Sequence, residues 1–233
     1  MYCFGRKYSY EVVQLEDFTS TQCLSTKTIA EWYGYFREMV IDHFLYNDEE
    51  VDKVGGPGRI VQIDISKFGC RSYTRSKINR VVDNWVLGII EEGSEDFKLK
   101  VCTETIQNAD VLIPFIQKHV HLGSTIETDY SEIYDCLSEH GFVHKKVKHC
   151  DPNNQSDVED GRRSHTPRIQ SQWAAVKGAF YKDNNNRKDS NSQSFADWIV
   201  EYQWRRNLRK KFEDPFEQLV KAVLNAFGDF RNT

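Results

Sequence analysis

Three stretches of the sequence decide the fold: Arg59–Ser66 (RIVQIDIS), Asn84–Glu91 (NWVLGIIE) and Phe97–Thr103 (FKLKVCT). Each is short, rich in β-branched or aromatic residues, and bounded by glycine or polar residues, which is the pattern of a β-strand. The segment between the first two, Lys67–Arg80, is rich in lysine, arginine, serine and tyrosine. We therefore expect three consecutive strands, with a basic segment joining the first pair.

The chain after residue 103 alternates between helical and extended patterns. The expected elements are a helix over 108–120, a strand over 124–128, a helix over 131–140, a strand over 143–147 and helices over 168–181, 195–211 and 215–227. Composition predicts polar loops over 150–164 and 183–194. This order fits an α/β, RNase H-like domain, a mixed sheet flanked by helices, which pattern alone gives as one of several α/β options.

The first fifty residues predict helices. Ile29, Trp32, Phe36 and Val40 recur at helical spacing, and a shorter helix is expected over Tyr10–Phe18. Two helices joined by a polar turn fit a helix-turn-helix, and they fit equally a helical bundle that packs on the main domain. All four tryptophans at helical positions, residues 32, 173, 198 and 204, are expected in the core.

Glycine and proline at residues 55–58 (GGPG) mark a break in the chain. We expect a helical, helix-turn-helix-like segment over 1–54, an RNase H-like domain over 55–207 and a helical tail over 208–233.

Length, composition and net charge restrict the class of protein. The chain has 233 residues, 39% of them hydrophobic, and a net charge of -4, which argues mildly against nucleic acid without excluding a local basic face. The six cysteines are scattered, so reduced thiols are expected, in the nucleus of a eukaryote or otherwise in the cytoplasm. No apolar run approaches the roughly 20 residues that span a bilayer, so no membrane partner is expected.

The phrases GGPG at 55–58 and VQIDISKFG at 61–69 resemble the opening of the catalytic domain in Merlin-type transposases and their ISXO2-like bacterial relatives. In that family the sequence reads G-G-x-G and then V-E-I-D-E-S-K-F-G. Further similar segments follow in order, at 85–88, 126–129, 137–147, 173–177, 201–206 and 214–216. The resemblance spans roughly residues 26–227.

The resemblance implies a DDE transposase, which cuts DNA ends and joins them to a target. Such chemistry uses carboxylates to hold two Mg²⁺ or Mn²⁺ ions. Asp64 and Asp129 stand where the family has its first two acids. Gln170, in HTPRIQSQW at 165–173, stands where the family has its glutamate. Transposases of this kind act as dimers or larger assemblies, so the resemblance also implies a homodimer.

Other acidic positions of the family are changed as well. Gln62 and Ile65 stand where glutamates often flank Asp64, and Pro167 replaces an asparagine. An amide cannot supply the negative charge that offsets two dications, so we expect weak or absent chemistry. Glu159 or Asp160 offers a substitute acid. Two functions stay open: a transposase-derived DNA-binding protein, or a non-catalytic module for protein or chromatin contacts on a domesticated fold. Unselected decay, a relic that still folds, is a third possibility.

Basic residues predict a DNA-contacting surface, with an ordinary solvated face as the alternative. The candidates are Arg71, Arg75, Lys77, Arg80, Arg162, Arg163, Lys177, Arg205, Arg206 and Arg209. A zinc site at His140, His144, His149 and Cys150 is disfavoured because the spacing matches no common structural site. His119 and His121 are expected to be exposed at a helix end.

Overall fold

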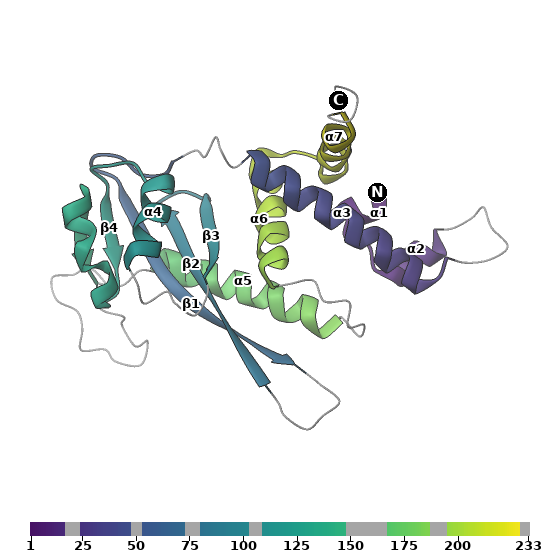
Figure 1. Ribbon diagram of the computed structural model, residues 1–233, viewed down its shortest axis with the longest axis horizontal. Helices are drawn as coiled ribbons and strands as arrows, with labels where there is room; N and C mark the ends of the chain where they lie inside the picture. The colour runs from purple at the N-terminus through teal and green to yellow at the C-terminus, as the bar shows by residue number, and fades with distance from the viewer. Residues whose placement is uncertain are drawn as a thin grey trace. The chain divides into compact units, whose positions relative to one another are not determined.

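The five strands of the computed structural model lie in one sheet, in the order β3-β2-β1-β4-β5 (Figure 1). Three are consecutive and antiparallel: β1 (Ile60–Ser72), β2 (Arg80–Glu91) and β3 (Phe97–Cys102). The other two run parallel to β1 on its far side: β4 (Thr125–Thr128) and β5 (Val143–Lys146). This mixed sheet, together with its flanking helices, confirms the expected α/β, RNase H-like class.

The structure describes residues 1–16, 24–47, 53–72, 80–102, 109–147, 167–186 and 195–228. The contacts divide the chain into two compact units. The sheet unit is Val51–Lys188, and the helical unit combines Met1–Glu50 with Asp189–Thr233. This division differs from the expected boundary at residue 207, because the helix Phe195–Lys211 packs with the N-terminal helices.

Alternation along β1 gives the sheet two different faces, because successive side chains of a strand point to opposite sides. Val61 and Ile63 are fully buried in a core cluster with the helices α4 (Ala109–His119) and η1 (Glu132–His140). Gln62 and Asp64 belong to the opposite face, where α5 (Pro167–Asn186) crosses the sheet (Figure 1). The sheet is therefore covered on both sides.

The helix α5 packs through a stripe of buried residues at helical spacing: Ile169, Trp173, Val176 and Phe180. The Trp173 ring makes edge contacts with Phe97 of β3 and Phe68 of β1, at centroid distances of 5.2 and 6.0 Å. These contacts fix the helix against β1, the strand that carries Asp64.

The helical unit contains five helices in the described part of the chain: α1 (Tyr2–Gly5), α2 (Tyr10–Leu15), α3 (Thr26–Asn47), α6 (Phe195–Lys211) and α7 (Pro215–Gly228). Its core is an apolar cluster of Phe4, Phe36, Val40, Trp204, Leu208 and Leu219. Gly5 permits close approach of α1 to α7, since a Cβ there would lie 3.1 Å from the backbone of Phe216.

A buried ion triad joins α3 to α6. Glu201 accepts hydrogen bonds from Arg37 and Arg205, each at 2.9 Å. Burial opposes ionisation of Glu201, but the two guanidinium groups outweigh it and lower the pKa of this carboxyl to about 2. Arg205 also donates to the backbone carbonyls of Gly5 and Phe4. The triad therefore ties the start of the chain to α6.

Several predicted boundaries are corrected. β1 continues to Ser72 and β2 begins at Arg80, so the basic segment between the first two strands is partly paired backbone. α5 continues to Asn186, where a polar loop was expected from residue 183. α3 runs to Asn47 and so ends before the predicted break at residues 55–58. The predicted loop over 150–164 lies outside the described residues.

Two burial predictions are wrong. His119 is only 4% exposed, because its ring packs on Phe115 and its Nδ1 lies 2.8 Å from the carbonyl oxygen of that residue. Trp32 is 56% exposed and stacks on Phe36 at the surface of α3. The other three helical tryptophans, at 173, 198 and 204, are buried as expected. Among the described helices, none has the length and apolar character needed to cross a bilayer.

Candidate functional site

The strand register brings Asp64 and Asp129 together. β1 and β4 pair in parallel with a constant offset, the last pair being Gln62 with Glu127. Asp64 on β1 and Asp129, just after β4, each lie two residues beyond that pair. Adjacent strands lie about 4.8 Å apart, so the two residues are neighbours at the carboxyl end of β4 and on the same face of the sheet.

Three N–H groups donate to the carboxylate of Asp64. The side-chain amide of Gln170 and the indole of Trp173 both donate to Oδ2 at 3.0 Å, and the backbone of Ile65 donates to Oδ1 at 2.8 Å. Gln170 and Trp173 lie three residues apart on α5, so both point to the same place on the sheet. The structure thus brings the side chains of positions 64 and 170 into contact.

Gly88 makes room for the indole that contacts Asp64. It pairs with Asp64 across β1 and β2. A Cβ at residue 88 would lie 2.6 Å from Cζ2 of Trp173 and 2.7 Å from Cε2 of Phe97. Sequence reasoning missed this role, although a glycine inside an otherwise apolar strand signals a close approach of another group.

Gln62 anchors the first turn of α5. Its side chain is buried, and Oε1 accepts a hydrogen bond from the backbone N–H of Ile169 at 3.1 Å. The first N–H groups of a helix have no partner within the helix, so this bond satisfies one of them. It also fixes the turn that presents Gln170, which is a second contribution that the sequence did not reveal.

Local hydrogen bonds hold Asp129 in place after β4. Its Oδ1 accepts from the backbone N–H of Ser131 at 3.1 Å. The hydroxyl of Thr128 donates to the backbone carbonyl of Asp129 at 2.8 Å and lies 2.8 Å from Nε2 of His144 on β5. Burial lowers the pKa of His144, as does the charge of Lys146.

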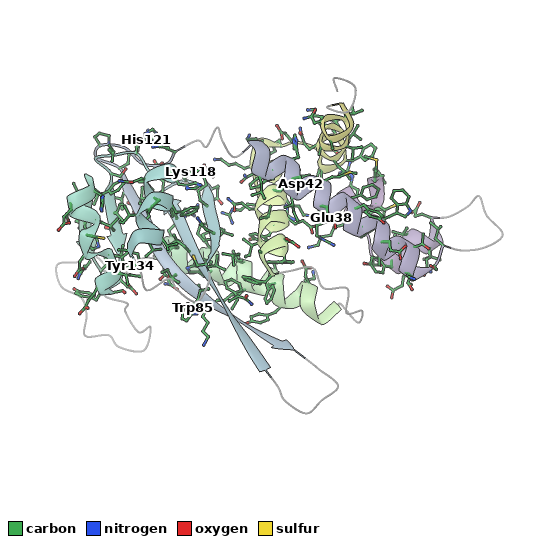
Figure 2. All side chains as sticks on the ribbon, viewed as in Figure 1. Glu38, Asp42, Trp85, Lys118, His121 and Tyr134 are labelled. Atoms are coloured by element: carbon green, nitrogen blue, oxygen red, sulfur yellow. The ribbon has the colours of Figure 1, made fainter. Side chains whose placement is uncertain are left out.

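Both acids influence the pKa of Tyr134. This residue of η1, labelled in Figure 2, is almost fully buried. Burial raises its pKa well above the ordinary value, and the carboxylates of Asp129 and Asp64 raise it further. The two acids therefore lie within electrostatic reach of one phenol, which agrees with the register argument.

The described residues do not fit a site for two divalent cations. Such a site needs several carboxylates whose oxygens are available as ligands. Both oxygens of Asp64 already accept N–H donors, and Gln170 adds no charge. No group of three or more His, Cys, Asp or Glu side chains is gathered anywhere in the described ranges. Glu159 and Asp160, like His149 and Cys150, lie outside those ranges.

The candidate DNA contacts are distributed over both units. Lys177 lies on α5, with its ammonium group 5.6 Å from the centroid of the Phe68 ring. Arg205 is committed to Glu201 and to two backbone carbonyls, so its guanidinium is a structural group of the helical unit. Arg206 is half-buried and Arg209 is exposed. The side chains of the other candidates lie outside the described residues: Arg71, Arg75, Lys77, Arg80, Arg162 and Arg163.

One side of α3 carries three exposed acids, the first of which is paired with Lys27. Glu31, Glu38 and Asp42 lie along one side of this helix, and Figure 2 labels the last two. Trp32 and Tyr35 are exposed beside them. A recognition helix approaches a phosphate backbone, and these carboxylates oppose such an approach. The helix-turn-helix role of this segment stays a prediction.

Comparisons with known proteins cover most of the sheet unit and part of α6. The profile of the ISXO2-like transposase domain matches residues 60–207. A search of solved structures returns the catalytic core domain of BIV integrase at 12% identity and a TM-score of 0.38, covering 72% of this chain and 97% of that one. A search of curated proteins gives no significant match.

Proposed function

This chain belongs to the ISXO2-like transposase domain family, and on that premise we propose that it is a DNA-binding protein whose DNA cleavage and strand-transfer chemistry is impaired. One observation carries the proposal: the side-chain amide of Gln170 donates to Oδ2 of Asp64, at the position where the family places its third acid. The first two acids, Asp64 and Asp129, remain neighbours.

The impairment follows from charge. At an effective dielectric of about 20 and a separation of 4 Å, one charge pair is worth about 4 kcal/mol. Each 1.36 kcal/mol of lost transition-state stabilisation lowers a rate about tenfold. Replacing a carboxylate by an amide removes one such charge. The same amide, with the indole of Trp173, occupies Oδ2, one of the two oxygens through which Asp64 would bind a cation.

DNA binding is supported by the family and by cations at the surface. Lys177 lies on the α5 face that carries Gln170 and Trp173, and Arg209 is exposed on α6. These groups contribute phosphate contacts that do not depend on the acids of the site. Binding therefore survives where cleavage is weak.

A specific observation favours a second function, a platform for protein partners. The exposed aromatic rings of Trp32 and Tyr35 lie on α3 beside Glu31, Glu38 and Asp42. Exposed aromatic residues are enriched at protein interfaces. Acidic neighbours favour a basic protein segment as the partner rather than DNA.

A salt titration of DNA affinity tests the proposed function. Counterion release makes the logarithm of affinity fall linearly with the logarithm of salt concentration, with a slope of about -0.9 for each neutralised phosphate of a duplex. We expect a steep slope for the full chain and a shallower one for Lys177→Gln, with Lys182→Gln on the same helix as the control. A protein platform without DNA binding would give no measurable affinity at low salt.

A further inference from the structure

We propose that the turn between α6 and α7 is a contact for single-stranded DNA, in which the ring of Phe212 stacks on a base. The inference rests on the proposed DNA binding and names the form of DNA that this surface takes. Its starting point is a side chain that contributes little to the fold: Phe212 is 97% exposed.

The backbone of Phe212 is as unusual as its exposure. Its φ is +55°, in the left-handed region, which a bulky side chain rarely adopts. The backbone N–H of Glu213 returns to the carbonyl of Leu208 at 2.9 Å, which closes the end of α6. Helix ends of this kind usually place glycine at the left-handed position. A large apolar ring there costs the fold stability and gains it no burial.

Strained, exposed residues of this kind cluster at functional sites. The surroundings of Phe212 indicate the partner. Arg209, Lys210 and Lys211 precede it in the last turn of α6, and all three are exposed. The acid that follows, Glu213, is exposed, and the next one, Asp214, is paired with Arg6 and caps α7. Three exposed cations therefore stand next to two acids in the sequence, and one of these acids is paired with Arg6.

Cations in the last turn of a helix also stabilise its dipole, and that accounts for the basic run by itself. It does not account for an exposed phenylalanine in a left-handed conformation. An aromatic ring beside several cations fits a ligand with alternating flat rings and phosphates. Sequence-tolerant binding of single strands uses this combination of stacking and backbone contact.

The form of DNA follows from the ring. In a duplex, each base face is covered by the neighbouring base pair, so an exposed ring finds a partner only at a helix end. In a single strand, every base offers a face. Phe212 therefore distinguishes single strands from duplexes, whereas the three cations bind the phosphates of both.

Fluorescence anisotropy on the full chain, with a labelled oligothymidylate and a labelled duplex of equal length, tests the inference. Phe212→Gly should weaken single-strand affinity by roughly 5- to 150-fold, the range measured for one stacked base, and leave duplex affinity unchanged. The same variant should raise the melting temperature of the protein, because glycine adopts a positive φ without strain. Lower affinity with higher stability is a result that a merely structural residue cannot give.

Three further variants sharpen the test. Phe212→Trp should retain single-strand affinity, because it keeps an aromatic face. Leu224→Ala removes another exposed apolar side chain of the same unit, 64% exposed, and should change neither affinity. Lys211→Gln should weaken both forms of DNA and reduce the single-strand salt slope by about 0.7.

The outcomes separate this inference from the proposed function. If the wild type binds both forms and Phe212→Gly leaves both affinities unchanged, the inference is overturned and the proposed function stands. If the wild type binds neither form, the proposed function is overturned as well. Binding to phosphatidylserine vesicles that depends on Phe212, or loss of a dimer in Phe212→Gly without loss of DNA affinity, would assign the ring to a membrane or to a second copy and overturn the inference.

Discussion

The amide of Gln170 donates a hydrogen bond to Oδ2 of Asp64 at 3.0 Å, and the indole of Trp173 donates to the same oxygen at the same distance. An acid at position 170 would instead meet Asp64 as a like charge and would require a cation or a proton between them. The glutamine replaces that requirement with a hydrogen bond. Side chains of the protein thus supply hydrogen bonds to the Asp64 carboxylate.

This relationship predicts a metal-linked change of stability in Gln170→Glu. Without divalent cations, the variant should lose about 1–2 kcal/mol of unfolding free energy, because a hydrogen bond becomes an exposed repulsion. Added Mn²⁺ should restore it by binding the folded state. Urea denaturation with and without Mn²⁺ measures both effects.

Gln172→Glu is the matched control, since it adds the same charge to the same helix two residues away. It should show no recovery with Mn²⁺. Equal recovery in the two variants would mean that Mn²⁺ binds elsewhere, and the assignment of position 170 to the site would be wrong.

Gly88→Ala tests how the indole is held against Asp64. The added methyl group would meet Trp173 at 2.6 Å, so the indole must shift, and overpacking of this kind costs about 1–3 kcal/mol. Thermal unfolding and the tryptophan emission spectrum should both change. Gly178→Ala on α5, where a Cβ meets nothing within 4 Å, should instead stabilise the protein by about 0.5–1 kcal/mol. A neutral Gly88→Ala would refute the close approach.

The ion triad of the helical unit predicts acid sensitivity. The pKa of Glu201 is about 2 in the folded state and 4.5 in its ordinary state, so the folded chain holds the carboxylate more tightly ionised. The resulting stability, on the order of 3 kcal/mol, is fully present above pH 4.5 and is lost as pH falls toward 2.

Glu201→Gln should remove this acid dependence and cost about 3–5 kcal/mol at neutral pH, because Arg37 and Arg205 lose their counter-ion. Glu217→Gln, at an exposed acid of α7, is the control and should leave the pH profile as it is. The unfolding free energy of the wild type should fall with pH below pH 5. If it stays constant down to the pH at which Glu201→Gln unfolds, the role of the triad is contradicted.

Local pattern predicted the sheet well and its surroundings less well. Alternation in β1 and β3 and the apolar run of β2 are local properties, so each strand was found, although β1 and β2 are longer than expected. That Asp64 and Asp129 lie near each other was predicted only through the family resemblance, because a register between distant strands leaves no local signal. Both side chains belong to a face that only the assembled sheet defines.

The errors have a common physical origin in partners that are distant in sequence. The basic run on α6 predicted a DNA contact at Arg205. Its guanidinium instead donates hydrogen bonds to Glu201 and to the backbone carbonyls of Phe4 and Gly5. Helical spacing on α3 placed Trp32 in the core, although it lies at the edge of the buried stripe that Phe36 occupies. Periodicity defines a face of a helix and does not define what covers it.

The most direct test of the account is the rate at which the full chain nicks DNA in Mn²⁺. If half of the roughly 4 kcal/mol of one charge pair reaches the transition state, Gln170→Glu should nick about 30-fold faster than the wild type. Gln172→Glu should match the wild type, and Asp64→Asn added to Gln170→Glu should abolish the gain. Equal rates for wild type and Gln170→Glu, both dependent on Asp64, would contradict the claim that Gln170 impairs the chemistry.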